Sequence, residues 1–268
     1  LGAFNFNLQP AYGWRITGFS IGSLVDNTFG SLSSRTYLQE NETLFETFAS
    51  SNFVNTLSGI GKLGFQYAPN YNLHLDYQLF GRTAQIENGG QQLSQINTLN
   101  NSIDGSLSQK PWAVEQQLSA YYSLGENNVM SLQASHKLQH QDPVYDLLTT
   151  QQPFVGSVEL ASGEDFRLTQ NRIIDTEKAD VLANYYLILN RTNHINFSLG
   201  LSTSNQVYNA QLYQALENGT VAFDSVDFQN KANFNYQDAF VGLTYRNKWG
   251  KLTWSPELNL HNYQVAFD

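Results

Sequence analysis

Apolar and polar residues alternate one for one along several stretches of this chain. Residues 72–79 read NLHLDYQL, and the same two-residue period recurs in residues 194–201 and 251–260. Successive side chains of a β-strand point to opposite faces, so each stretch predicts a strand with one apolar and one polar face. A soluble sandwich and a membrane barrel both use such strands. Strand length, loop asymmetry and the chemistry of the polar face must therefore separate the two folds.

Five short segments rich in Pro, Gly and Asn predict tight turns between the strands. They lie roughly 60 residues apart, and alternating runs of about 8 to 14 residues flank them, long enough for a tilted strand to cross a bilayer. The stretches between these hairpins are rich in Gln, Asn, Ser and Asp, which predicts long loops. Short turns at one end and long loops at the other are typical of outer-membrane barrels. We expect the turns at 9–13, 68–72, 125–128, 190–193 and 247–250, and the loops at 26–52, 86–112, 140–176 and 207–235.

The composition favours the membrane alternative. Charged residues make up 14% of the chain and aromatic residues 13%, whereas ordinary soluble domains contain roughly 25% charged residues. The absence of any run of 18 apolar residues predicts that no helix crosses a membrane. A net charge of −9 disfavours a nucleic-acid partner, whose phosphates require a basic surface. The absence of Cys excludes disulfides and Cys-ligated metals.

Three patterns that could carry chemistry are better explained without it. The segment GFSIG at 18–22 matches a nucleophile elbow, but that motif needs a strand-to-helix turn and no amphipathic helix follows. His136 and His140 share one face of a strand about 13 Å apart, too far to chelate one ion. We interpret the acidic residues of the long segments as solvated rather than as a hydrolytic pair: Glu164, Asp165, Asp224 and Asp227. We therefore expect no enzyme, metal site or cofactor, and the sequence identifies no substrate-binding residue.

Three stretches resemble the barrel of TonB-dependent outer-membrane receptors of Bacteroidetes-type bacteria: residues 75–81 (LDYQLFG), 185–209 and 245–263. As a style of strand, turn and loop, the resemblance covers most of residues 54–265. In that family a barrel of about 22 strands surrounds an N-terminal plug, and a short periplasmic segment couples transport to an inner-membrane complex. The resemblance implies active uptake of a nutrient, such as a siderophore, glycan or peptide, by the parent protein.

We therefore expect an all-β fold: an antiparallel wall of about ten strands from a larger transmembrane barrel. Residues 1–268 would form a single partial barrel domain, with the plug and the remaining strands outside this chain. The expected location is the outer membrane of a Gram-negative bacterium. The expected partners are its lipids, the plug and remaining strands, a TonB-type energising protein and a surface lipoprotein. The alternatives are a barrel that serves as a scaffold in secretion, assembly or adhesion, and a secreted glycan-binding β-sandwich.

The alternation also predicts which face each side chain occupies. Aromatic side chains near the turns are expected to form a belt at the membrane surface: Tyr67, Tyr71, Tyr121, Tyr122, Tyr185, Tyr186, Tyr245, Trp249 and Trp254. The lipid-facing set is Leu73, Leu75, Leu79, Leu118, Ile195, Phe197, Leu199, Val241, Leu243, Leu252, Leu258 and Leu260. The inward set, expected to be unsatisfied or exposed to water within this chain alone, is Asp76, Gln78, Glu115, Gln117, Lys178, Asp180, Asn184, Asn196, Glu257 and Asn259. Pro256 falls on the apolar face of the last strand, cannot donate a ladder hydrogen bond, and is expected at a bulge near the periplasmic rim.

Overall fold

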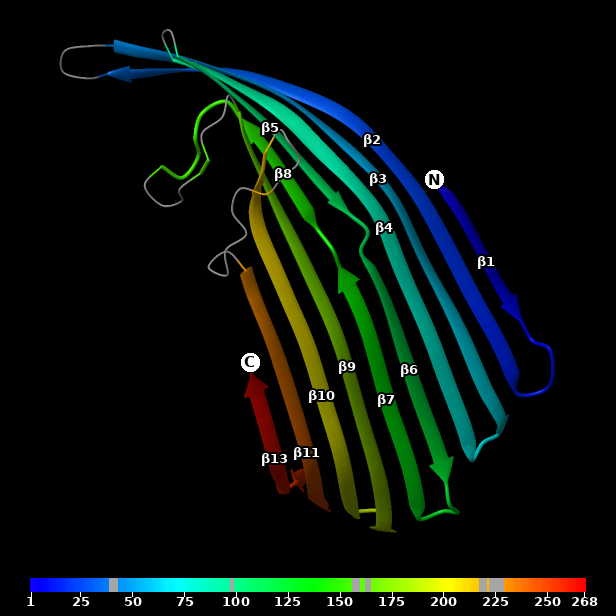
Figure 1. Ribbon diagram of the computed structural model, residues 1–268. Helices are drawn as coiled ribbons and strands as arrows, with labels where there is room; N and C mark the ends of the chain where they lie inside the picture. Colours follow the sequence, from blue (N-terminus) through cyan, green and yellow to red (C-terminus); the bar gives the residue numbers. More distant parts are fainter. Residues whose placement is uncertain (39–42, 97–98, 156–159, 162–164, 217–220, 222–228) are drawn as a thin grey trace.

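The computed structural model describes residues 1–38, 43–96, 99–155, 160–161, 165–216, 221 and 229–268. These residues form one antiparallel β-sheet of thirteen strands (Figure 1). In the described part of the chain, no helix is long and apolar enough to cross a membrane. The all-β, antiparallel fold expected from the sequence is confirmed. The strands are β1 (Gly2–Leu8), β2 (Trp14–Leu38), β3 (Thr43–Asn70), β4 (Leu73–Ile96), β5 (Leu99–Gln109), β6 (Trp112–Ser123), β7 (Asn128–Gln141), β8 (Val144–Thr149), β9 (Phe166–Asn190), β10 (Asn193–Ala215), β11 (Gln229–Trp249), β12 (Leu252–Trp254) and β13 (Glu257–Phe267).

Three of the breaks between strands fall at prolines. Pro111 separates β5 from β6, Pro143 separates β7 from β8, and Pro256 separates β12 from β13. Proline lacks a backbone N–H and cannot donate to the ladder. Each of these prolines still accepts a hydrogen bond at its carbonyl oxygen, from the backbone N–H of Ala84, Arg172 and Tyr245 at 3.0, 3.0 and 3.1 Å. The thirteen elements therefore follow ten paths across the sheet, each path pairing with the next in chain order.

All five predicted turns lie at one end of the sheet, at the bottom of Figure 1. Backbone hydrogen bonds link each turn region to the next: Ala68 N–H to Gly13 O at 2.7 Å, Ser123 N–H to Asn72 O at 2.8 Å, Ile188 N–H to Asn127 O at 2.7 Å and Lys248 N–H to Thr192 O at 2.9 Å. Gly13, Gly125 and Gly250 have positive φ angles, which glycine adopts without strain. The predicted topology of the hairpins is thus confirmed.

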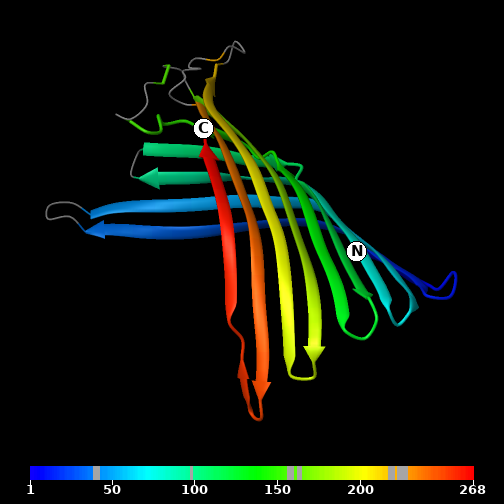
Figure 2. The same ribbon diagram turned by 90° about the horizontal axis from the view of Figure 1, so that it is seen from below.

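The prediction of long polar loops is wrong for most of their length. β2 continues to Leu38, β3 begins at Thr43 and β4 continues to Ile96, so residues expected to be loop extend the same ladders. These strand parts carry polar residues on both faces. Their sequences therefore lack the apolar–polar alternation from which a strand is predicted. Ladder pairing nevertheless satisfies their backbone N–H and C=O groups. In Figure 2 the β2–β3 and β4–β5 hairpins run across the direction of β9 to β13, so the sheet bends strongly in this upper part.

Cross-strand partners point to the same side, so the registers assign every side chain to one of two faces. The whole predicted lipid-facing set lies on one face, here called the apolar face. The whole predicted inward set lies on the other, here called the polar face. No residue of the lipid-facing set is buried, and seven of the twelve are exposed. The described residues form no second sheet, which contradicts the β-sandwich alternative.

The sheet does not close on itself within the described residues. β1 pairs only with β2, through residues 16–22, and the other edge is formed by β12 and β13, which pair only with β11. Figure 1 shows both termini part-way along the wall, at opposite edges. The expectation of an open, curved wall is confirmed for this part of the chain.

Candidate functional site

On the apolar face of the lower strands, the described residues form a continuous hydrophobic surface that no other described segment covers. One cross-strand row runs through Leu132, Ala183, Leu199, Val241 and Leu260 on five successive paths. The side chain of Leu199 is 60% exposed and that of Leu260 is 67% exposed. Monomeric soluble proteins rarely expose a contiguous apolar surface larger than a few hundred Å². This face therefore requires an apolar environment.

Aromatic rings border the apolar face at the turn end, and their polar tips point toward the turns. The hydroxyl of Tyr185 donates to Asn128 Oδ1 at 2.7 Å, and the hydroxyl of Tyr245 donates to Asn193 Oδ1 at 2.8 Å. This orientation suits a ring at a boundary between an apolar and a wet environment. Tyr67, Tyr122, Trp249 and Trp254 share the apolar face. Tyr121 and Tyr186 were predicted for the belt but lie on the polar face, because each is adjacent to a tyrosine that takes the apolar side.

The polar face carries hydrogen bonds that run sideways between strands. Asp180 accepts from Ser202 Oγ at 2.6 Å and Ser135 Oγ at 3.2 Å, and it lies 3.3 Å from Lys178 Nζ. Asp76 likewise accepts from Gln66 Nε2 at 2.8 Å. None of the inward residues is buried, as expected for residues that lack a dry core in this chain, but several of them have partners on the same face. Cross-strand neighbours on one face are close enough to bond, and the single-strand pattern did not show which residues would meet.

The structure describes two of the three chemical patterns of the sequence in full and the third only in part. Ser20 lies within β2 on the apolar face, far from any strand-to-helix turn. His136 Nε2 is 3.2 Å from Glu177 Oε1, and His140 Nδ1 is 2.6 Å from Asp175 Oδ1, so each His has its own carboxylate. Among the described residues no three metal-ligating side chains meet. Asp165 is exposed; Glu164, Asp224 and Asp227 lie outside the described residues.

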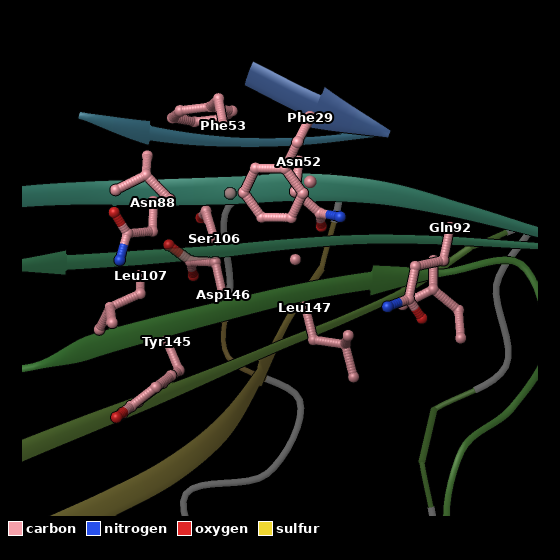
Figure 3. Close-up of a pocket in the computed structure, with 15 residues that line it drawn as sticks. Phe29, Asn52, Phe53, Asn88, Gln92, Ser106, Leu107, Tyr145, Asp146 and Leu147 are labelled. Carbon is pink, nitrogen blue, oxygen red and sulfur yellow. The ribbon is translucent and has the colours of Figure 1, made fainter. Parts of the chain in front are cut away.

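A hollow of about 540 Å³ lies on the polar face of the upper sheet, where β2, β3, β4, β5 and β8 run side by side (Figure 3). Its floor is one cross-strand row: Phe29, Asn52, Gly90, Gly105 and Leu147. The two glycines face each other at the centre of the row, and the space over Gly105 is open. We call this feature the glycine hollow.

The two central glycines are not equivalent. A Cβ atom on Gly90 would lie 2.7 Å from the carbonyl oxygen of Ser51 and would also collide with the side chain of Asn52. A Cβ atom on Gly105 would meet nothing within 4 Å. Gly90 is therefore required by close packing, whereas Gly105 leaves open the space above it.

The adjacent rows supply the walls of the glycine hollow. Val54, Asn88, Leu107 and Tyr145 form the row on one side, and Gln92 and Ile103 belong to the row on the other. Arg172 lies beside the site: its guanidinium carbon is 5.7 Å from the centre of the Tyr145 ring, and Nη2 donates to the Tyr145 hydroxyl at 3.4 Å. These contacts orient the tyrosine ring.

Farther along the polar face, Glu46 lies on the outer part of β3, well beyond the apolar surface. Its carboxylate accepts a hydrogen bond from Ser94 Oγ at 2.7 Å and one from the Tyr37 hydroxyl at 2.7 Å. These two bonds, that from Ser94 first, lower the pKa of Glu46 below its usual value. The far tip of the β2–β3–β4 ribbon is thus held together by side chains as well as by its ladders.

The sequence interpretation missed the glycine hollow entirely. All of its lining residues except Phe53 and Val54 come from two segments expected to be loops and from the start of a third. The available signal was the pair Gly89–Gly90 followed by Gly105, since glycine inside a strand marks a close approach or an open floor. That signal becomes meaningful only once these segments are known to be strands.

Comparison with known proteins adds only weak similarity. No family model matches the chain, and no curated protein matches it. The crystal structure of Fiu, a ferric-catecholate import receptor of E. coli K12, aligns with a TM-score of 0.34 and 8% identity, covering 99% of this chain and 60% of that one. The β domain of the Bordetella autotransporter BrkA aligns with a TM-score of 0.22 and 11% identity, covering 99% and 96%. The ferric citrate transporter FecA aligns with a TM-score of 0.18 and 10% identity, covering 97% and 51%. This chain therefore spans 60% of the length of Fiu, and none of these similarities identifies its family.

Proposed function

We propose that this chain is part of the barrel wall of a TonB-dependent outer-membrane receptor that takes up a nutrient. The observation that carries the proposal is the division of a single sheet into two faces. The lower strands expose a continuous apolar surface on one face and a hydrogen-bonded polar surface on the other. In a bilayer that arrangement places lipid outside and a polar interior inside.

The open edges support a larger barrel. β1 and β13 each leave one side unpaired in the described sheet, and an unpaired backbone group costs several kcal/mol in lipid. Further strands would satisfy these groups, and a plug would fill so wide an interior. In this proposal the five turns face the periplasm, and the long upper strands stand outside the cell. A TonB-type protein and a surface lipoprotein are its proposed partners, and the source is a Gram-negative bacterium of Bacteroidetes type.

Membrane fractionation tests the location. The protein, expressed from its own gene, is expected in the outer-membrane fraction and is expected to stay monodisperse only with detergent present. A protein that remains monodisperse in plain buffer would refute the barrel. Uptake is tested separately by growth of a deletion strain on single nutrients. Loss of growth on one nutrient, restored by the intact gene, is expected for a receptor; unchanged uptake of every nutrient would instead favour a scaffold.

A further inference from the structure

We propose that the glycine hollow is a binding site for an uncharged sugar ring. The proposal rests on the proposed uptake function for its biological meaning, because the hollow then lies on the inner face near the outer opening of the barrel. The binding chemistry itself follows from the residues that line the hollow.

The shape of the hollow favours a flat ligand. Its floor is open at Gly105, whereas the Asn52 side chain lies over Gly90. Phe29 and Leu147 stand at the two ends of the row. Figure 3 shows Phe29 on β2 and Tyr145 on β8, on opposite sides of the lined space. Phe29 is 57% exposed, so it has apolar surface left for a ligand. The C–H faces of a pyranose ring pack against such aromatic and aliphatic surfaces.

The polar groups of the lining suit hydroxyl groups. Asn52, Asn88 and Gln92 place amide side chains around the hollow, and an amide both donates and accepts hydrogen bonds. Asn88 Oδ1 is covered and has no hydrogen-bond partner among the described residues. Leaving a covered acceptor unpaired is unfavourable, so a small shift that brings a ligand hydroxyl to this oxygen would be favourable. Pockets of this kind combine an apolar lining with a few placed polar groups.

The charge of the site disfavours an anionic ligand. The lining contains no Lys or Arg. The nearby Arg172 donates from Nη2 to the Tyr145 hydroxyl at 3.4 Å, and its Nε is covered and has no partner among the described residues. The one acidic side chain of the lining, Asp146, accepts from Thr169 Oγ1 at 2.5 Å on the apolar face of the sheet. The chain as a whole carries a net charge of −9. A carboxylate or phosphate ligand would therefore lack the charge-assisted partner that such groups need.

The backbone of the floor disfavours a peptide. Peptides that add to a sheet use unpaired backbone groups at an edge. The floor strands β3, β4 and β5 lie inside the sheet, each paired on both sides at this level. A ligand in the hollow can therefore bind only to side chains, which suits a hydroxylated ring better than an extended peptide.

Calorimetric titration of the detergent-purified protein, expressed from its own gene, tests the proposal. The probes are maltohexaose, cellohexaose, mannohexaose and xylohexaose as neutral saccharides, hexagalacturonate as the anionic saccharide and (Ala-Gly)3 as the peptide. In Gly105→Trp the indole occupies the open floor, so affinity for the neutral saccharide that binds should fall about tenfold or more. Phe29→Ala removes an exposed ring at the end of the floor without filling the site, and it should weaken the same binding. This second variant keeps the proposal testable if the Gly105→Trp protein fails to fold.

Gly81→Trp is the matched control. Gly81 pairs with another glycine, Gly61, and a Cβ there also meets nothing within 4 Å, but it lies on the apolar face. Its affinity for the saccharide should equal that of the unmodified protein. The assignment would be overturned if no neutral saccharide binds, or if both Gly105→Trp and Phe29→Ala bind the saccharide as tightly as the unmodified protein does. It would also be overturned if only hexagalacturonate or (Ala-Gly)3 binds and these substitutions weaken that binding. These results leave the membrane location untouched, since that is decided by fractionation of the same preparation.

Discussion

Replacement of Leu199 by Arg tests the assignment of the apolar face most directly. Leu199 is 60% exposed and lies in a row of apolar side chains on five successive paths. The first acidic residue along that face of β9 is Glu177, six residues from Ala183, or about 20 Å at the rise of a strand. A guanidinium at position 199 would therefore have neither water nor a counter-ion. The expected cost near the middle of a bilayer is about 2–4 kcal/mol, or a roughly 30- to 900-fold shift in the folding equilibrium.

The assay is reversible unfolding by denaturant in lipid vesicles, followed by Trp fluorescence. Gln117→Arg serves as the control, because Gln117 is exposed on the polar face and lies two residues from Glu115. It should change the free energy of unfolding by less than about 0.5 kcal/mol. Equal losses in the two variants, or no loss in Leu199→Arg, would show that the two faces do not meet different environments. The membrane interpretation would then fail.

Three further outcomes follow from individual contacts. Gly200→Val should destabilise the protein by about 1–3 kcal/mol, since a Cβ there would collide with the ring of Phe240 on the neighbouring strand; denaturant titration measures this. Ser94→Ala should raise the pKa of Glu46 toward its usual value in an NMR titration, because the first of its two stabilising hydrogen bonds is lost. The lowered pKa stabilises the folded state above the ordinary Glu pKa and ceases to do so as the pH falls through the lowered value. Asn190→Ala should cost about 0.5–1.5 kcal/mol in the same denaturant titration, because Asn190 Oδ1 accepts from the backbone N–H groups of Thr192 and Asn193.

Each of these changes has an internal comparison. Gly81→Val adds the same side chain where space is open. If it destabilises the protein as much as Gly200→Val does, collision with the Phe240 ring is not the cause of the loss. Ser31→Ala is the control for Ser94→Ala, because the Ser31 hydroxyl bonds to the Ser50 hydroxyl at 2.8 Å and not to a carboxylate. It should leave the pKa of Glu46 unchanged. An Asn190→Asp variant keeps the accepting oxygen and should retain most of the stability that Asn190→Ala loses.

The local pattern of the sequence predicted the two-faced strands and their common turn end. Alternation is a property of single strands, so the faces of Leu199 and Asp180 could be assigned without knowing their neighbours. The turn residues likewise act locally, through φ angles and side-chain acceptors such as Asn190 Oδ1. The breaks at Pro111 and Pro143 could have been inferred by the same rule as that at Pro256, but these prolines lay in segments already taken for loops.

What only the tertiary structure decided depends on pairing between distant strands. Above the apolar surface both strand faces are polar, so composition there predicts loops, and the ladders that satisfy the backbone become visible only in the fold. The glycine hollow joins Phe29, Asn52, Gly90, Gly105 and Leu147, which are brought together by four successive registers. A shift of one residue in any of those registers would turn that row to the other face. Single-strand periodicity carries no information on register, which is why the sequence determined the faces of this sheet while the fold alone determined its candidate binding site.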